Sequence, residues 1–442
     1  MPPDLRARIE NKSAKIGVLG LGYVGLPLSI EFARKGFSVT GFEVRRDLVH
    51  RLNRGFSHVT DVPSSVVREV VRSGRFRATG RFDEIRGLDA IIICVPTPLR
   101  KSKEPDVSYI LSAVREIAPR LRKGQIIILE STTYPGTTRE LVLPLLRRKG
   151  LAPGRGFFLA FSPERVDPGN KTFRIANTPK VVGGITRECG RMAGLLYSQV
   201  VQRVVPVSSA EAAEMVKLLE NTFRAVNIGL ANEVALMCHR LGLDSWEIIA
   251  ASATKPFGYM PFYPGPGIGG HCIPLDPHYL AWKMRTLHYK TRMIELAGEI
   301  NTEMPAFWVG KVADALNDVG KPMRGARILV LGVAYKKDID DLRESPALDI
   351  LDLLSKKGAQ ARYHDPYVPE IVDDGHTPDG AVGRSVPLDD EALRGADAVI
   401  IVTDHSAIDY DRVKRLAPIV IDSRNALARA AARRPEPAVA AR

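Results

Sequence analysis

Short apolar runs alternate with amphipathic stretches along most of this 442-residue chain, and the alternation begins twice. The first series starts with KIGVLG at Lys15 and continues through SVTGFEV, DAIIICVP and QIIILES. The second starts with RILVLG at Arg327 and continues through ARYHDP, DAVIIVTDH and PIVIDSR. Strands that alternate with helices pair in parallel, so the pattern predicts an α/β protein with two Rossmann-like, doubly wound parallel-sheet domains.

The two series also resemble one another in sequence, and the matching segments are similarly spaced in each. GLDAIII from Gly87 has the same place in the first series as GADAVII from Gly395 in the second. The echo favours two related mononucleotide-binding folds, although ordinary βαβ patterning alone can produce such a likeness.

A long helix is predicted between the two series. The segment from Ser209 to Leu241 has no proline and keeps helical periodicity, and Ser208 with Glu211 has the pattern of a capping box. At about 1.5 Å per residue such a helix is about 50 Å long, more than one domain needs. We expect it to join the two sheet domains and to support a homodimer or a larger homo-oligomer. The expected domains are residues 1–205, 206–320 and 321–430, followed by a frayed tail at 431–442.

Composition excludes several classes of protein. The formal net charge is +13, but no dense Lys/Arg run with interleaved aromatic residues indicates a nucleic-acid-binding surface. The four cysteines are far apart, which supports neither a disulfide framework nor a zinc ribbon. The longest uncharged stretch that could be mistaken for a membrane span, residues 16–30, is too short to cross a bilayer. The N-terminal residues are charged, which does not fit a signal peptide. We expect a cytoplasmic protein without membrane insertion.

A dinucleotide-binding turn is predicted after the first strand. Gly20, Gly22 and Gly25 form GxGxxG between a strand and a helix, where bare backbone lets a pyrophosphate approach the helix N-terminus. Glu43 ends the next strand, where a carboxylate binds the ribose hydroxyls of NAD and repels the extra phosphate of NADP. NAD is the expected cofactor, while Arg45 and Arg46 leave residual NADP use open.

A glycine- and proline-rich loop carries the candidate nucleophile. The segment KPFGYMPFYPGPGIGGHCIPLD, residues 255–276, is suited to wrapping a ligand and holding the Cys272 thiol in a fixed pose. The alternative is a cysteine buried for packing, and a metal site at His271, Cys272, Asp276 and His278 is not expected because no second ligand cluster accompanies it. Lys217 and Asn221 are four residues apart and share one helix face, which is either a ligand site or a solvated face.

Two strand ends carry further candidates. SPER places Glu164 and Arg165, with Val166 next, directly after the apolar strand FFLAF, and EST places Thr132 at the end of another strand. Strand ends are where α/β proteins collect functional side chains, although from these residues alone a surface turn is as good an interpretation.

Together these motifs resemble the UDP-sugar 6-dehydrogenases, which oxidise the C6 alcohol of a nucleotide sugar to a carboxylate with two NAD. The resemblance covers residues 14–425 and rests on GLGYVGLPL, VPTP, EST, SPER, the Lys217 and Asn221 pair, GGHCIPLD and YKKDIDDLRES. It implies a place in polysaccharide biosynthesis, with a first domain that binds NAD, a central dimerisation and catalytic-loop domain, and a last domain that binds the UDP-sugar.

The resemblance also implies roles for individual residues. Cys272 is the nucleophile that forms a thiohemiacetal and then a thioester, and Glu164 is the general base in thioester hydrolysis. Lys217 and Asn221 hold the oxyanion, and Asp276 with Thr132 orders water. The implied cofactor-binding residues are Gly20, Gly22, Tyr23, Val24, Gly25, Glu43, Arg46, Pro96, Thr97, Ser131, Thr132 and Arg343. The implied substrate-binding residues are Glu164, Arg165, Val166, Lys217, Asn221, Tyr263, Gly265, Gly267, Gly269, Lys336 and Arg424. No metal is implied.

The departures from the family concern the substrate. Glucose-oxidising members typically have GGSCFPKD where this chain has GGHCIPLD, and His271 and Leu275 resemble the N-acetylhexosamine branch. We expect UDP-N-acetylglucosamine as substrate, with UDP-N-acetylgalactosamine, UDP-N-acetylmannosamine and UDP-glucose as alternatives. A single-step hydroxyacid dehydrogenase and a non-catalytic sensor of NAD or nucleotide sugar are the competing functions.

Overall fold

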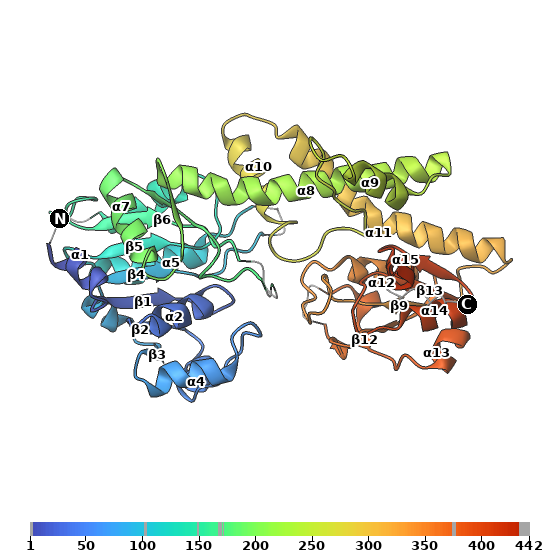
Figure 1. Cartoon of the computed structure of the whole chain (residues 1–442), viewed down its shortest axis with the longest axis horizontal. Coiled ribbons are helices and arrows are strands. Elements are labelled where there is room, and N and C mark those ends of the chain that lie inside the picture. Colours follow the sequence, from blue (N-terminus) through green and yellow to red (C-terminus); the bar gives the residue numbers. More distant parts are fainter. Residues whose placement is uncertain are drawn as a thin grey trace, which may run out of the picture. The chain divides into compact units, whose positions relative to one another are not determined.

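The protein is described by a computed structural model, which covers residues 3–100, 104–147, 150–166, 170, 172–373 and 377–432 (Figure 1). The chain divides into two compact units, Met1–Glu220 with His278–Tyr289 and Asn221–Pro277 with Lys290–Arg442. The domain boundaries expected from the sequence remain a prediction, and residues 433–442 of the expected tail lie outside the described residues.

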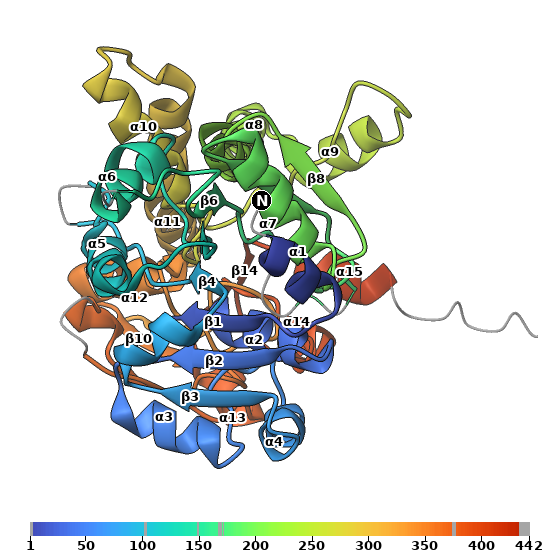
Figure 2. The ribbon, with the colours of Figure 1, turned by 90° about the vertical axis from the view of Figure 1, so that its left-hand side faces the viewer.

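An eight-stranded sheet forms the centre of the first unit, in the order β3-β2-β1-β4-β5-β6-β7-β8. Its strands are β1 (Lys15–Leu19), β2 (Ser38–Phe42), β3 (Phe76–Thr79), β4 (Ala90–Ile93), β5 (Ile126–Leu129), β6 (Phe158–Phe161), β7 (Lys180–Gly184) and β8 (Val204–Val207). Figure 2 shows β1, β2 and β3 side by side, with the parallel pairing Val18↔Gly41 and Gly41↔Ala78. The predicted doubly wound parallel sheet is confirmed.

Helices cover both faces of this sheet because successive strand residues point in opposite directions. Ile16, Val18 and Ile92 lie in one apolar cluster, whereas Leu19, Ile91 and Ile93 lie in another. The first cluster includes residues of α1 (Pro3–Glu10), α2 (Gly25–Arg34), α3 (Arg46–Asn53), α4 (Ser64–Arg72) and α7 (Arg187–Tyr197). The second includes residues of α5 (Ser108–Ile117), α6 (Leu143–Leu146) and the start of α8 (Ala210–Leu241).

One pair of strands departs from the parallel arrangement. β7 runs antiparallel to β6, with Phe161 opposite Gly183, while β8 is parallel to β7. The first residue of β7, Lys180, therefore lies at the sheet edge where the parallel strands β1 to β6 end. This reversal decides which side chains meet at that edge.

The long helix predicted from the sequence is confirmed as α8, which contributes residues to both units. Its cap is one residue later than expected. The Ser209 hydroxyl accepts a hydrogen bond from the Ala212 amide at 3.1 Å, so Ser209 and not Ser208 caps the helix. Glu211 lies in the first turn and pairs with Arg139 instead of completing a capping box.

A four-stranded parallel sheet forms the centre of the second unit, in the order β10-β9-β13-β14. Its strands are β9 (Arg327–Leu331), β10 (Gln360–His364), β13 (Ala398–Ile401) and β14 (Val420–Asp422), and a two-stranded antiparallel sheet consists of β11 (Glu370–Ile371) and β12 (Gly383–Arg384). The helices besides α8 are α9 (Ser245–Ala253), α10 (Asp276–Thr286, shared with the first unit), α11 (Arg292–Asp318), α12 (Pro346–Lys356), α13 (Asp390–Gly395), α14 (Tyr410–Leu416) and α15 (Ala426–Ala432). This is the second parallel-sheet domain that the sequence predicts.

No helix among the described residues combines the length and apolar character needed to cross a membrane. The described residues also contain no group of three or more His, Cys, Asp or Glu side chains placed to hold a metal ion.

Candidate functional site

The glycine turn follows β1 in the first unit. Gly20 has a φ of +89°, which favours glycine, and a Cβ on Gly25 would lie 1.9 Å from the Gly20 carbonyl oxygen. These two glycines are therefore required by the turn itself. At Gly22, a Cβ would meet no heavy atom of the described residues within 4 Å. Gly22 thus leaves its backbone open to a ligand, as a dinucleotide pyrophosphate requires.

Glu43, which follows β2, faces this turn. Its carboxylate accepts a hydrogen bond from the Leu21 amide at 3.4 Å and another from the Arg45 amide at 3.0 Å. An oriented acid beside the glycine turn is the arrangement that binds a ribose diol. Tyr23 is half-exposed, and Arg46 is exposed at the first residue of α3. The turn and the acid together fit NAD.

The other candidate cofactor residues follow β4 and β5. Pro96 is exposed and Thr97 is buried, with its carbonyl oxygen accepting a hydrogen bond from the Tyr279 hydroxyl. The Ser131 hydroxyl donates to the Val95 carbonyl at 2.7 Å, which ties the ends of the two strands together. Thr132 is the next residue and is half-buried. Val24 is half-buried and precedes α2.

Glu164 lies directly after β6 and is firmly held. One carboxylate oxygen accepts from the backbone amides of Arg165 at 2.8 Å and Val166 at 2.6 Å, and the other accepts from the Lys180 ammonium at 3.1 Å. Burial opposes ionisation, but the charge and hydrogen bond of Lys180, the Val166 amide and the charge of Lys217 together lower the pKa of Glu164. Glu164 is therefore an ionised carboxylate near neutral pH.

Arg165 turns toward the long helix. Its guanidinium pairs with Glu220 of α8 at 2.6 Å and donates to the Pro179 carbonyl at 2.7 Å. Lys217, one turn earlier on α8, is buried. The first unit thus brings Glu164 and Lys217 within electrostatic reach of each other.

Asn221 has a fixed orientation in the second unit. Its side-chain amide donates to the Asp276 carboxylate, and its carbonyl oxygen accepts from Arg224. The Arg224 contact identifies which side of Asn221 carries the NH₂ group, and that group has a second hydrogen available beyond the Asp276 bond. Asn221 and Asp276 are both buried.

Cys272 lies four residues before Asp276. Its carbonyl oxygen accepts a hydrogen bond from the Asp276 amide at 2.9 Å, which closes the turn into α10. All four cysteines lie within the described residues and none of them forms a disulfide; Cys94, Cys189 and Cys238 are buried, whereas Cys272 is partly exposed. Cys272, which the sequence singles out, is thus the partly exposed one of the four, and its backbone is bonded to Asp276, the partner of Asn221.

Tight backbone contacts hold the loop that precedes Cys272. The Gly265 amide donates to the Asn232 side chain at 2.9 Å, and its carbonyl accepts from the Trp308 ring nitrogen at 3.1 Å. The Gly270 amide donates to the Arg343 carbonyl at 2.8 Å. This last bond joins the cysteine loop to the loop that follows β9.

Side chains would not fit at several glycines of this loop. A Cβ on Gly265 would lie 2.7 Å from an Arg424 nitrogen, and one on Gly269 would lie 2.5 Å from the Tyr335 side chain. Gly267 has a φ of +130°. Tyr263 is half-exposed and stacks on Trp246, with ring centroids 5.2 Å apart.

Arg424 follows β14 and points back over the sheet. Its Nε donates to the Val402 carbonyl at 2.8 Å, and burial lowers its pKa. Lys336 lies on the loop after β9 and is partly exposed, and Arg343 on the same loop is exposed and pairs with Asp341 at 2.6 Å. The second unit therefore gathers Lys336, Arg343 and Arg424 at the strand ends of one sheet.

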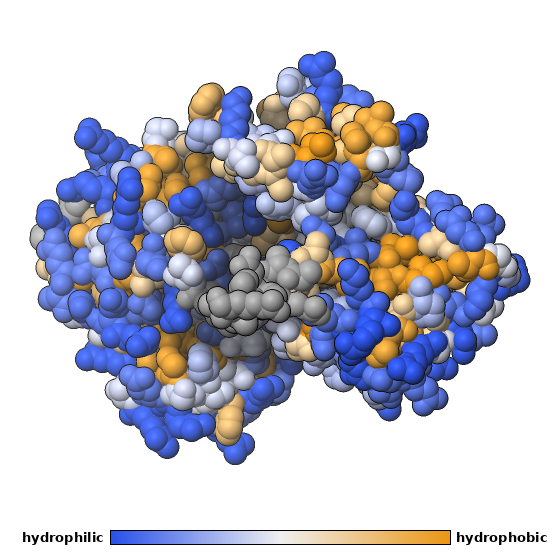
Figure 3. Space-filling view, turned by 45° about the vertical axis from the view of Figure 1, so that its right-hand side comes forward, coloured by the Kyte–Doolittle hydropathy of each residue, from blue (hydrophilic) through white to orange (hydrophobic). Residues whose placement is uncertain are grey.

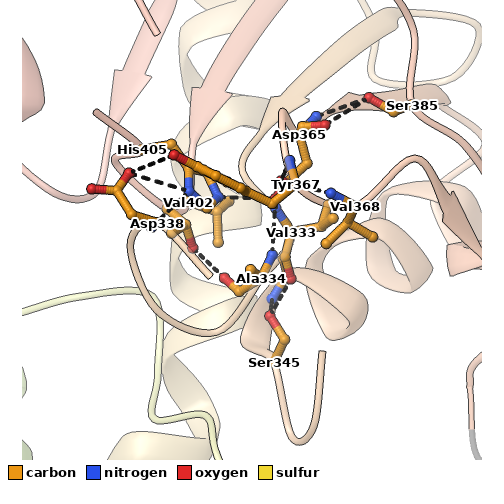
Figure 4. A network of polar contacts seen from close by, with 12 residues as sticks. Val333, Ala334, Asp338, Ser345, Asp365, Tyr367, Val368, Ser385, Val402 and His405 are labelled. Atoms are coloured by element: carbon orange, nitrogen blue, oxygen red, sulfur yellow. Dashed lines mark hydrogen bonds and ion pairs between the residues drawn. The ribbon is translucent and has the colours of Figure 1, made fainter. Parts of the chain in front are cut away.

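A buried polar network supports the loop after β9 (Figure 4). The Asp365 carboxylate accepts hydrogen bonds from the Val333 and Ala334 amides at 2.7 and 3.1 Å, and pairs with the His405 ring at 2.9 Å. The other His405 nitrogen accepts from the Asp338 amide at 3.0 Å. Both ends of the loop segment that carries Lys336 are thereby fixed.

The sequence analysis missed Lys180, Asp365 and His405. A lysine at the head of an otherwise apolar strand, KVVGG, is the signal that could have indicated a buried partner for Glu164. Asp365 and His405 follow strands β10 and β13, so the sequence could have predicted that they lie at strand ends. It could not have predicted that they pair with each other.

The geometry defines a class of protein: a dinucleotide-binding α/β unit, a second α/β unit and an ordered loop with an accessible thiol. Profiles of the UDP-glucose/GDP-mannose dehydrogenase family match all three parts, the NAD binding domain at residues 14–201, the central domain at 211–303 and the UDP binding domain at 329–429. The chain belongs to this family of nucleotide sugar dehydrogenases, which are NAD-dependent oxidoreductases.

Relatives cover nearly the whole chain. The UDP-N-acetyl-D-mannosamine dehydrogenase of Pyrococcus horikoshii is 36% identical over 93% of this chain and 95% of its own. The UDP-N-acetyl-D-glucosamine 6-dehydrogenase of Pseudomonas aeruginosa is 35% identical over 81% of this chain and 84% of its own. The solved structure of a UDP-D-ManNAc dehydrogenase from Pyrococcus horikoshii matches with a TM-score of 0.83 and 35% identity, over 96% of this chain and 97% of that chain.

The glycine turn yields a stability prediction. Gly25→Ala should lower the free energy of unfolding by about 1–3 kcal/mol, because its methyl group would meet the Gly20 carbonyl. Gly22→Ala, in open space, should stay within about 0.5 kcal/mol of the parent. Urea unfolding of the three proteins measures both changes, and equal losses in the two variants would contradict the packing argument.

The Asp365 network yields a pH prediction. Burial opposes ionisation of Asp365, but hydrogen bonds from His405 and from backbone amides lower its pKa. A lowered carboxyl pKa stabilises the fold above its unfolded value, and the stabilisation is lost as the pH falls through the folded value. Asp365→Asn should therefore cost about 3 kcal/mol at pH 7, and the difference from the parent should narrow below about pH 4.

Urea unfolding at a series of pH values measures this difference. Asp318→Asn, at an exposed position, is the control and should stay within about 0.5 kcal/mol of the parent. A loss in Asp365→Asn that is unchanged between pH 7 and pH 3 would show that the ionised carboxylate is not what stabilises the network.

Proposed function

We propose that this protein oxidises the C6 alcohol of a UDP-N-acetylhexosamine to a carboxylate, in two NAD-dependent steps, the second of which takes place on the Cys272 sulfur. The observation that carries the proposal is the surroundings of that thiol. Cys272 is partly exposed, its loop is fixed by backbone hydrogen bonds, and it closes a turn onto Asp276, which holds Asn221.

The chemistry accounts for four electrons. The first step removes a hydride from C6 and a proton from its hydroxyl, which gives an aldehyde. The Cys272 sulfur then adds to the aldehyde carbon as a thiohemiacetal, and loss of a second hydride and a proton gives a thioester. Water cleaves the C–S bond, releases the carboxylate and restores the thiol.

NAD supplies the acceptor for both hydrides. The proposed cofactor residues are Gly20, Gly22, Tyr23, Val24, Gly25, Glu43, Arg46, Pro96, Thr97, Ser131 and Thr132, with Arg343 from the second unit. The open backbone at Gly22 and the oriented Glu43 carboxylate support this assignment.

Lys217 and Asn221 are proposed to stabilise the oxyanion of the thiohemiacetal. They are four residues apart on α8 and both are buried, so an ammonium and an amide donor act with little competition from water. Cys272 lies just before α10, and the positive end of a helix favours negative charge on its sulfur.

Glu164 is proposed to act as the general base in thioester hydrolysis. Its carboxylate is ionised and lies at a strand end beside the Lys217 charge. Asp276 and Thr132 are proposed to order the attacking water.

The UDP-sugar is proposed to contact the turn after β6, α8 and residues of the second unit. The proposed contacts are Glu164, Arg165, Val166, Lys217, Asn221, Tyr263, Gly265, Gly267, Gly269, Lys336 and Arg424. The cationic side chains Lys336 and Arg424 suit the diphosphate, and the close packing of Gly265 against Arg424 brings the glycine-rich loop to one of these cations.

The sugar itself is proposed to be an N-acetylhexosamine. Relatives named for UDP-N-acetylmannosamine and UDP-N-acetylglucosamine are almost equally similar to this chain, and those sugars are C2 epimers. His271 and Leu275 favour UDP-N-acetylglucosamine, with the mannosamine and galactosamine epimers and UDP-glucose as competitors. Ratios of kcat/KM over a panel of these four nucleotides decide among them.

Replacement of the thiol tests the mechanism. Cys272→Ser should lower acid formation by at least about 10³-fold, because an alcohol is a poor nucleophile and a poor leaving group. Cys238→Ala, at a buried cysteine on α8, is the control and should keep most of the activity. Product mass and NADH absorbance measure the result. Full uronic acid formation by Cys272→Ser at the parent's rate would contradict the thioester mechanism. One NADH per sugar with an aldehyde or ketone product from the parent would favour a single-step hydroxyacid dehydrogenase type of site, and absence of turnover in the parent would favour a sensor.

A second copy of the chain is proposed as the partner of α8. Phe223, Leu230, Met237 and Leu241 are exposed and lie on one face of this helix, since they are seven, seven and four residues apart. Figure 3 shows apolar residues gathered on the surface among the hydrophilic ones. An apolar stripe of this kind suits burial against an identical helix.

Sedimentation tests the dimer. The parent should sediment as a dimer or larger at about micromolar concentration, and the double variant Leu230→Glu, Met237→Glu should shift to monomer because like charges would meet at the interface. Val319→Glu, an exposed apolar position after α11, should leave the assembly unchanged. A monomeric parent would contradict the proposal.

A further inference from the structure

Four side chains form a buried polar cluster in the first unit, and the mechanism above uses only one of them. Glu130 follows β5, Glu164 follows β6, Lys180 begins β7 and Tyr197 ends α7. Because β7 runs antiparallel to β6, its first residue meets the last residues of the parallel strands. Strand direction therefore delivers a cation to the edge where Glu164 lies.

Lys180 is shared between two carboxylates. Its ammonium donates to one oxygen of Glu130 and, at 3.1 Å, to one oxygen of Glu164. The other oxygen of Glu130 accepts a hydrogen bond from the Tyr197 hydroxyl. Lys180, Glu130 and Tyr197 are buried, and Glu164 is the most exposed member, with 14% of its side chain accessible.

This sharing bears on how readily Glu164 takes a proton. A carboxylate alone with a buried ammonium is a weak base, since protonating it would leave the ammonium without a counter-charge. With Glu130 on the same ammonium, Lys180 keeps a partner when Glu164 becomes protonated. Without Lys180, two buried carboxylates would face one another, and Glu164 would be protonated too readily to serve near neutral pH.

We propose that Glu130 and Lys180 are positioning residues that set the basicity of Glu164 for thioester hydrolysis, Lys180 by holding its charge and Glu130 by competing for Lys180. The inference rests on the proposed function, in which Glu164 is the general base. Neither residue touches the reacting atoms; both act through Glu164.

Several other groups affect the ionisation of Glu164 and Glu130. Burial raises the pKa of Glu130 despite the charge of Lys180. Burial also opposes ionisation of Glu164, but Lys180, the Val166 amide and Lys217 of α8 together lower the pKa of that carboxyl. On its own turn, Arg165 pairs with Glu220, and the buried Cys94 thiol nearby has a raised pKa because of burial. Lys180 exerts the largest influence among the charged groups.

Two substitutions should have opposite effects. In Glu130→Gln, Glu164 is the one remaining carboxylate that pairs with Lys180. The acidic limb, which is the pH range where the rate of thioester hydrolysis falls because Glu164 takes a proton, should therefore move to lower pH by about one unit. The plateau rate should also fall, because the base is weaker. Lys180→Met removes the cation, so the limb should move to higher pH by about one unit. The double variant Glu130→Gln, Lys180→Met removes one charge of each sign. Its acidic limb should lie at a pH between those of the two single variants.

The experiment isolates the hydrolysis step. Thioester on Cys272 is formed at a single pH from NAD and UDP-N-acetylglucosamine, or whichever sugar of the panel is turned over. The sample is then jumped to pH values from about 3 to 9, because the pKa of Glu164 is lowered from its usual value. Decay of the acylated protein is followed by intact mass, and the first NADH burst reports the oxidation steps separately. Thermal unfolding of each variant checks that it is folded.

Opposite shifts in the two single variants, with an intermediate double variant, are expected. General loss of structure cannot produce shifts of opposite sign, and if Lys180→Met does not fold, the same comparison is made between Glu130→Gln and the double variant. If the acidic limbs of the two single variants move in the same direction, or do not move, while the thioester still forms, this inference alone is overturned. A parent that forms no thioester on Cys272 would overturn the proposed function and this inference with it.

Discussion

Parallel pairing of strands is the constraint on which the candidate site depends. In a parallel sheet every strand ends at the same edge, so residues that follow different strands meet there however far apart they are in sequence. In the first unit this edge gathers the Gly20 turn, Glu43, Thr132 and Glu164 after β1, β2, β5 and β6. In the second unit the same geometry gathers Lys336, His405 and Arg424 after β9, β13 and β14. The backbone hydrogen bonds of the two sheets thus determine which polar groups can cooperate.

The reversed strand β7 adds what the parallel strands cannot. The carboxyl ends of β1, β2, β4, β5 and β6 supply carboxylates, hydroxyls and backbone groups to the edge. β7 brings its amino end to the same edge, with Lys180 as its first residue. A buried ammonium needs a counter-charge, and the two carboxylates nearby provide it. In the second unit, Asp365 has the corresponding organising role, since it accepts backbone amides from the loop after β9 and pairs with His405. Each unit therefore fixes its functional loop with a buried charge.

Much of this was predictable from the sequence, and the exceptions share a physical cause. Alternating apolar runs predicted both sheets, and the absence of proline predicted α8, because these features depend on local periodicity. The glycines at Gly20 and Gly25 were readable because a tight turn needs them at fixed spacing. The proposed roles of Lys217 and Asn221 came from the resemblance to a family, whereas Cys272 was also predicted from its glycine-rich loop. Lys180 was missed because its importance depends on the direction of β7 relative to β6, and the Asp365–His405 pair was missed because it joins residues 40 positions apart. The cap of α8 differed by one residue, since neighbouring serines offer equivalent caps.

The central claim is that the protein oxidises C6 of the sugar twice, the second time while the sugar is bound to the Cys272 thiol, before water releases it. The number of NADH molecules formed per sugar tests this most directly, with purified protein, excess NAD, a limiting UDP-N-acetylhexosamine, absorbance at about 340 nm and the product mass. The account predicts two NADH for each sugar and a product that carries a carboxylate at C6. One NADH per sugar, with an aldehyde or ketone as the product, would contradict it.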